Sequence, residues 1–113
     1  MNALRIGGLI TENATDPDTL VRAHRHWGYG AAYFPLVADE SLQGEMVAAL
    51  READIVVAEL GAYCINVLDS DPAVREGNIG RICETLALAD RHGVLCCVIH
   101  GGTVETGGWG AIN

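Results

Sequence analysis

Lysine is absent from this sequence, and positive charge of any kind is scarce. Seven arginines stand against fifteen acidic residues, which gives a net charge of -8 at pH 7. A protein that binds a nucleic-acid backbone needs clustered Lys and Arg side chains facing the phosphates. The composition therefore predicts no nucleic-acid partner, and it suits a cytoplasmic protein.

Long apolar runs are also missing. No stretch approaches the roughly 20 apolar residues of a membrane-spanning helix. The sequence passes from Met1 straight into a strand-like run, with no basic leader before a long apolar region. We therefore expect no membrane partner and no signal peptide.

Cysteine occurs without the Cys-x-x-Cys spacing of many zinc and redox sites. Cys64, Cys83, Cys96 and Cys97 are the four cysteines, and three of them sit inside apolar runs. Buried free thiols are typically found in such runs. We expect a reduced chain with no disulfide and no cysteine-bound zinc.

What the sequence does contain is a repeated unit of one strand followed by one helix. The junctions "HRHWGYGAAYFP", "LREADIVVAELG" and "ADRHGVLCCVIHGG" each read as a helix end, a short turn and an unbroken apolar strand. The predicted strands are residues 4–10, 31–34, 55–60 and 94–99. The predicted helices run from the Asp16-Pro17 start to about Trp27, from a Ser41 cap to Ala53, and from Asp71-Pro72 to His92.

Unbroken apolar strands separated by helices predict an α/β fold with a parallel sheet covered by helices. Such units build either a doubly wound open sheet or a (β/α)₈ barrel. No Gly-x-Gly-x-x-Gly follows the first predicted strand, so a dinucleotide site is not indicated.

In both architectures the functional residues lie at the carboxyl ends of the strands. This rule selects residues 11–13, 37–40, 59–66 and 100–109 as candidates. The last of these segments is a polar, glycine-rich loop that carries His100, Glu105 and Trp109.

The third unit resembles the sugar phosphate isomerase/epimerase family, the xylose-isomerase-like TIM barrels. The resemblance rests on motifs between residues 54 and 109 and is only topological before them. The matching residues are Glu59-Leu60-Gly61-Ala62-Tyr63, Asn66, Asp71-Pro72, Leu86-Ala87-Leu88-Ala89-Asp90, Gly93 and Gly107 to Trp109.

The resemblance implies a barrel of eight βα units, a divalent metal (Mn²⁺, Mg²⁺ or Zn²⁺), and proton transfer next to a sugar carbonyl through an enediolate. A complete barrel takes about 250 residues. Residues 1–113, with about four strands and three helices, would therefore form the N-terminal half of one. In the family most metal ligands come from later strands, so the resemblance implies that the metal belongs to the complete barrel and that this chain alone is inactive.

The resemblance and the strand-end rule together assign the candidate residues. Glu59 and His100 are the catalytic candidates, with His100 also a metal ligand, and Tyr63, Asn66 and Trp109 are the sugar-binding candidates. Each has a plainer interpretation. Glu59 and His100 could bond neighbouring loops, Asn66 could stabilise its own turn, and Trp109 could plug the barrel rim.

Three other histidines, His24, His26 and His92, lie near predicted helix ends, where we interpret them as structural. Two functions stay open. One is the N-terminal part of a metal-dependent sugar or sugar-phosphate isomerase or epimerase. The other is a non-catalytic half-barrel that acts as an oligomer or binding module. An open parallel edge makes a homo-oligomer the expected assembly.

Overall fold

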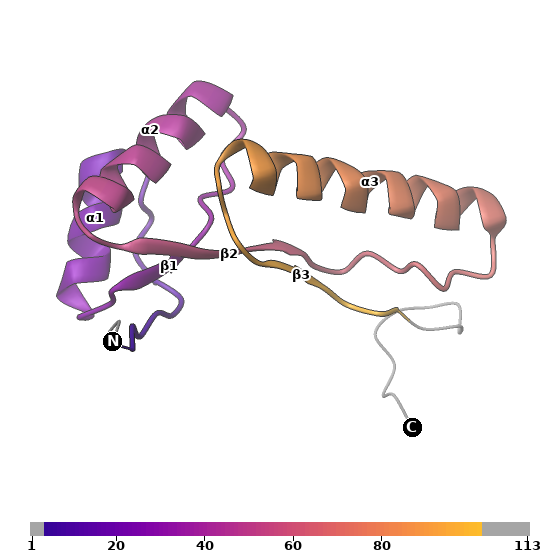
Figure 1. Ribbon diagram of the computed structural model, residues 1–113, viewed down its shortest axis with the longest axis horizontal. Helices are drawn as coiled ribbons and strands as arrows, with labels where there is room; N and C mark the ends of the chain where they lie inside the picture. The colour runs from indigo at the N-terminus through magenta and orange to yellow at the C-terminus, as the bar shows by residue number, and fades with distance from the viewer. Residues whose placement is uncertain (1–3, 103–113) are drawn as a thin grey trace. The chain divides into compact units, whose positions relative to one another are not determined.

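The computed structural model describes residues 4–102, in which three helices alternate with three strands (Figure 1). The helices are α1 (Pro17–His26), α2 (Glu40–Glu52) and α3 (Pro72–Arg91). The strands are β1 (Ala31–Tyr33), β2 (Val56–Ala62) and β3 (Cys97–Ile99). The predicted α/β class with parallel strands is confirmed.

The strands follow the order β1-β2-β3, and both pairs are parallel. Ala31 pairs with Val56 and Ala62 pairs with Ile99, while a bulge shifts the register between Ala32 and Tyr33. The chain divides into two compact units, Met1–Glu59 and Leu60–Asn113, and the division falls within β2. Each unit is described by itself below.

In the first unit, α1 and α2 pack against each other and bury an apolar core. Both helices begin at an aspartate whose carboxylate accepts a backbone N–H: Asp16 from Thr19 at 2.9 Å and Asp39 from Leu42 at 3.0 Å. Leu50 and Met46 of α2 are among the most buried side chains, at 0% and 1% exposure. This core is what positions β1 and the first part of β2.

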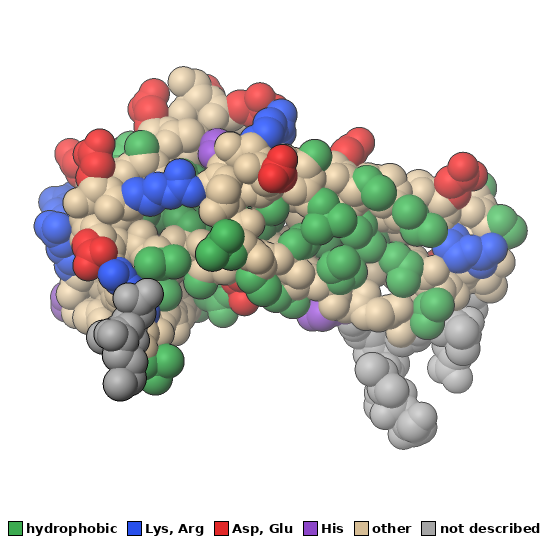
Figure 2. All heavy atoms as spheres, viewed as in Figure 1, with side chains coloured by type: hydrophobic (Ala, Val, Ile, Leu, Met, Phe, Trp, Pro, Cys, Tyr) green, Lys and Arg blue, Asp and Glu red, His purple; other side chains and the backbone are tan. Residues whose placement is uncertain are grey.

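In the second unit, the core is much smaller. Ala62, Ile65 and Ile82 form its buried cluster, and Ile82 and Ala89 are the two buried residues of α3. Val74, Ile79 and Leu86 of the same helix are each between 45% and 47% exposed. Figure 2 shows hydrophobic side chains gathered on the surface where α3 and β3 lie.

The prediction of a first strand over residues 4–10 is wrong. This segment makes one isolated parallel bridge, Gly7 to Ala31, and the Ile6 carbonyl accepts the N–H groups of Gly30 and Ala31. Two adjacent glycines weaken a strand because they lose more backbone entropy and offer no side chain to pack. Gly7 also lies so close to β1 that a Cβ there would be 2.6 Å from the Ala31 carbonyl oxygen.

Other boundaries also differ from the prediction. β1 ends at Tyr33, and β2 runs over Val56–Ala62 rather than residues 55–60, so Glu59 lies within the strand and not at its end. The cap of α2 is Asp39 rather than Ser41, whose hydroxyl instead lies 3.5 Å from Glu45 inside the helix. β3 begins at Cys97 rather than at residue 94, because the Val94 N–H bonds back to the Ala89 carbonyl at the end of α3. The helix starts at Asp16-Pro17 and Asp71-Pro72 are confirmed.

The expected burial of the cysteines is wrong. All four thiols are free, as predicted, but Cys64, Cys83 and Cys96 are exposed and Cys97 is half-buried. Cys64 stands in a turn with a positive φ of 57°, and Cys83 lies on α3, which buries few of its residues. No helix among residues 4–102 is long and apolar enough to cross a membrane.

Candidate functional site

In the second unit, three of the residues predicted from sequence lie near the carboxyl ends of β2 and β3: Tyr63, Asn66 and His100. Tyr63 directly follows β2 and His100 directly follows β3, and the last residues of these strands pair with each other. The two rings therefore meet, with centroids 5.5 Å apart and planes tilted by 48°. Tyr63 is 41% exposed and His100 is half-buried. We name the group of Tyr63, Asn66, His100 and Gly102 the strand-end site.

Asn66 lies in the loop after β2 and borders this site. Its side-chain oxygen accepts the N–H of Leu68 at 3.0 Å, and its carbonyl accepts the Asn78 amide of α3 at 2.7 Å. Gly102, with a φ of +86°, lies against it, so a Cβ on Gly102 would be 2.2 Å from the Asn66 side-chain oxygen. Asn66 thus stabilises its own turn, and its side chain lies beside Gly102.

Glu59 belongs to the first unit. It pairs with Tyr33 across the β1-β2 ladder, and its carbonyl accepts the Phe34 N–H at 2.9 Å. The half-buried residue lines a hollow of about 200 Å³ together with Arg5, Tyr33 and Ala58. Trp109 and Glu105 lie outside the described residues.

The described residues do not by themselves fit a resident divalent metal. Within residues 4–102, no three His, Cys, Asp or Glu side chains lie close enough together to share one ion. Structural and catalytic zinc sites need at least three protein ligands. His100 as a metal ligand therefore stays a prediction that this part of the chain does not support.

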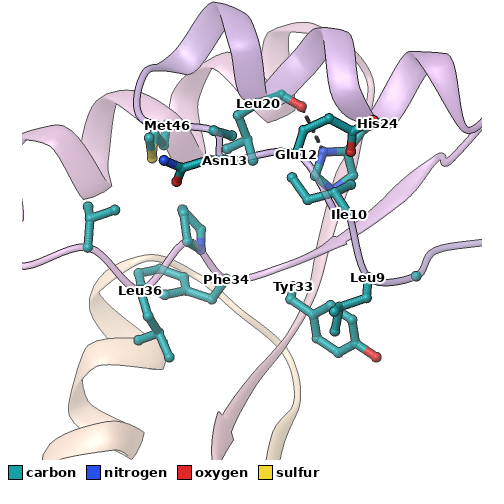
Figure 3. Close-up of a pocket in the computed structure, with 14 residues that line it drawn as sticks. Leu9, Ile10, Glu12, Asn13, Leu20, His24, Tyr33, Phe34, Leu36 and Met46 are labelled. Atoms are coloured by element: carbon teal, nitrogen blue, oxygen red, sulfur yellow. Dashed lines mark hydrogen bonds between the residues drawn. The ribbon is translucent and has the colours of Figure 1, made fainter.

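A second polar site lies in the first unit, where α1, Met46 of α2 and the segments 8–14 and 33–37 line an open pocket of about 370 Å³ (Figure 3). Glu12, Asn13, His24 and Tyr33 contribute its polar side chains. The strand-end rule selected Glu12 and Asn13, but His24 was interpreted as structural only. Its spacing of four residues from Leu20 puts both on the buried face of α1, which is the signal that could have placed it here.

Hydrogen bonds fix two ionisable groups of this pocket. The Trp27 indole N–H lies 3.1 Å and 3.2 Å from the two carboxylate oxygens of Glu12. The backbone N–H of Glu12 itself and then the Trp27 indole N–H lower the pKa of the Glu12 carboxyl. His24 is 3% exposed, and its Nδ1 lies 2.8 Å from the Leu20 carbonyl oxygen.

The other two helix-end histidines lie where the sequence predicts. His26 is exposed in the last turn of α1, and His92 is the C-cap residue of α3.

Comparison with family models, with curated proteins and with solved structures finds no match to this chain.

Proposed function

We propose that the chain is part of a metal-dependent sugar or sugar-phosphate isomerase or epimerase with a xylose-isomerase-like barrel. In this proposal the strand-end site binds the sugar. The observation that carries it is the meeting of Tyr63 and His100 at the ends of two neighbouring parallel strands. In barrel enzymes this is the end of the sheet that carries the active site.

The order of the strands supports the barrel part of the proposal. The segment around Gly7 bridges to β1, and β1, β2 and β3 follow one another as neighbours in chain order. Doubly wound sheets reverse their strand order at a switch point near the first strand. A run of successive parallel neighbours without reversal is compatible with a barrel, and it also occurs within one half of a doubly wound sheet.

The chemistry of the strand-end site suits a sugar. The Tyr63 ring offers an apolar face to the C–H groups of a pyranose or of an open chain, and the imidazole and phenol offer hydrogen-bonding groups for hydroxyls. Sugars need this mixture because each ring has apolar faces and polar edges. The Asn66 side chain bonds the Leu68 N–H and lies beside Gly102, so this turn borders the proposed sugar site.

His100 is the proposed proton carrier. An imidazole can remove the proton from the carbon next to a carbonyl and return it to the carbonyl carbon. The proton of the adjacent hydroxyl passes to the carbonyl oxygen, so that the sugar is isomerised without net gain or loss of atoms. The family's metal, when bound, would polarise the carbonyl oxygen. Because the described residues supply no metal ligand set, we expect the 113-residue chain to bind sugars but to turn them over little.

Binding is tested by titrating the chain with a panel of aldoses, ketoses and their phosphates while recording ¹H–¹⁵N spectra. We expect at least one sugar to shift the signals of Tyr63, Asn66 and residues 100–102. His100→Gln should weaken that binding, whereas His92→Gln, on the α3 C-cap of the same unit, should leave it unchanged. If no sugar binds, or if both variants bind equally well, the proposal fails.

A second function, a non-catalytic binding or oligomeric module, is favoured by the apolar surface of the second unit. Leu95 is 96% exposed, and Ile99 on β3 is 44% exposed. A group of exposed apolar side chains marks a protein-contact surface more often than a single exposed apolar side chain does. A discrete dimer by native mass together with no sugar binding would support this module. A monomer that binds a sugar would reject it.

A further inference from the structure

The outer edge of β3 lies in the second unit and is not used by the proposed sugar site. In the part of the chain that the structure describes, β3 is the last strand of the sheet and β2 is its neighbour. The Leu60 N–H donates to the Cys96 carbonyl, and in a parallel ladder the backbone groups of alternate residues face the same neighbour. Cys96 and Val98 therefore face β2, and the N–H and C=O groups of Cys97 and Ile99 face the outer edge.

The segment that presents this edge lacks the features that protect most edge strands. Natural edge strands commonly carry charged residues or proline, which stop another strand from pairing with them. Residues 94–99 read VLCCVI, with no charge and no proline. Short apolar segments of this kind, with several β-branched residues, pair with copies of themselves. A second copy of β3 is therefore a partner that matches the chemistry of this edge.

An exposed apolar stripe on α3 borders the same edge. Ile79, Cys83 and Leu86 follow the i, i+4, i+7 spacing of one helix face, and Ile79 and Leu86 are 47% and 45% exposed. The stripe lies next to the buried Ile82, and a right-handed β2-α3-β3 connection turns it toward β3. Figure 2 shows hydrophobic side chains gathered on one face over α3 and β3. The stripe and the strand edge thus form one surface.

The middle of α3 lies over β3, so the stripe and the edge share a centre. Ile82 packs in one cluster with Ala62, and Ala62 pairs with Ile99. Two β3 strands paired antiparallel about Val98 would place Cys97 of each copy opposite Ile99 of the other, which joins their outward N–H and C=O groups in hydrogen-bonded pairs. The two-fold axis then runs perpendicular to the sheet, and both α3 helices lie on the same face of the joined sheet.

We propose that the 113-residue chain forms a two-fold dimer through the outer edge of β3, with the α3 stripes of the two copies packed side by side. Cys83, the middle residue of the stripe, then lies close to the two-fold axis. The inference rests on the apolar surface behind the second candidate function, and it holds whether or not the chain binds a sugar. A longer chain with a further strand at this edge would fill it instead.

The first measurement is the mass in solution, by sedimentation velocity over a range of protein concentrations and without sugar. We expect a species of twice the 12.0 kDa mass of one chain. Each copy has a net charge of -8, so added salt should strengthen the association by screening the repulsion. A monomer at every concentration would overturn the proposal and would leave the sugar titration unaffected.

A pair of variants at Cys97 tests the strand edge. Cys97→Pro and Cys97→Ala both remove the thiol, but only proline removes the N–H that faces the outer edge. Because the loss occurs in both copies, Cys97→Pro should dimerise about tenfold more weakly than Cys97→Ala, or weaker still. The pairing of β3 with β2 uses Val98, so the two variants should give the same far-UV circular dichroism spectrum.

A second pair tests the stripe and decides the question if Cys97→Pro does not fold. Leu86→Glu places a charge in the proposed contact and should weaken the dimer by about tenfold or more. Val74→Glu is the matched control, because Val74 is 46% exposed on the same helix but lies outside the stripe. A short bis-maleimide reagent should join the Cys83 thiols of two copies. A dimer in which a folded Cys97→Pro or Leu86→Glu variant associates as tightly as its control, or whose cross-links omit Cys83, would overturn the proposal.

Discussion

Replacing Gly102 with alanine perturbs the strand-end site at one defined contact. The backbone φ of Gly102 is +86°, and a non-glycine residue in the left-handed region costs about 1–2 kcal/mol. The new Cβ would lie 2.2 Å from the Asn66 side-chain oxygen, so the Asn66 side chain must move. That movement breaks its 3.0 Å bond from the Leu68 N–H, which contributes about 0.5–1.5 kcal/mol.

The two effects together predict that Gly102→Ala lowers the free energy of unfolding by about 1.5–3.5 kcal/mol. Gly77→Ala is the matched control in the same unit, because a Cβ there meets nothing within 4 Å. Gly77 lies inside α3, so its replacement should stabilise the protein by about 0.8–1.0 kcal/mol. Urea unfolding followed by far-UV circular dichroism measures both values.

The same substitution in an Asn66→Ala background separates the two effects. Without the Asn66 side chain the 2.2 Å conflict is removed and a 3.1 Å approach of the Cβ to the Val67 backbone nitrogen remains, so the cost of Gly102→Ala should fall toward the backbone contribution of about 1–2 kcal/mol. An identical cost in both backgrounds would refute the contact between Gly102 and Asn66. A stabilising Gly102→Ala would refute the left-handed backbone as well.

Three further outcomes follow from the described contacts. Asp16→Asn should keep the helix cap of α1 at neutral pH. Hydrogen bonds from Thr19 lower the folded-state pKa of the Asp16 carboxyl. The stabilising effect of the Asp16 carboxylate is therefore present above its unfolded-state pKa and is lost as pH falls below about 4. The Asp16→Asn variant should accordingly show a weaker acid dependence of unfolding. Arg5→Met removes an exposed ion pair with Asp54 at 2.8 Å and should cost less than about 1 kcal/mol in urea unfolding, an effect that disappears in high salt. A thiol reagent should modify three exposed cysteines rapidly and the half-buried Cys97 more slowly, and a uniform slow reaction would contradict the exposure described here.

The helix starts could be predicted from sequence because their signals are local. Asp-Pro pairs at residues 16–17 and 71–72 combine a capping carboxylate with a proline that has no N–H to satisfy, and both helices begin there. Gly28 and Gly93 adopt positive φ just after α1 and α3, as expected of residues that end a helix.

The first strand could not be predicted, because its formation depends on partners rather than on local preference. The run LRIGGLI is apolar enough for a strand, yet Leu4 and Leu9 are 94% and 75% exposed, so little apolar surface is buried in return for ordering the chain. The prediction that the cysteines are buried was wrong for a related reason. Apolar runs predict burial only where the fold supplies a covering layer, and α3 buries few of its residues.

Among the candidate site residues, the sequence could locate some and missed another. Tyr63 and His100 were found by their places after two parallel strands, a rule that fixes which residues share an edge but not their contacts. His24 was missed because an imidazole near a helix end has a sufficient structural role there. Only the packing of α1 and α2 shows that a pocket lies beside it.

The most direct test of the sugar proposal is the spectrum of the chain during titration with the sugar panel, read at the His100 side chain. The account predicts that one class of sugar shifts the His100 and Tyr63 ring signals together, since their centroids are 5.5 Å apart, and that His100→Gln weakens this binding. Ring signals that no aldose, ketose or sugar phosphate shifts would contradict the assignment of this strand end to sugar binding.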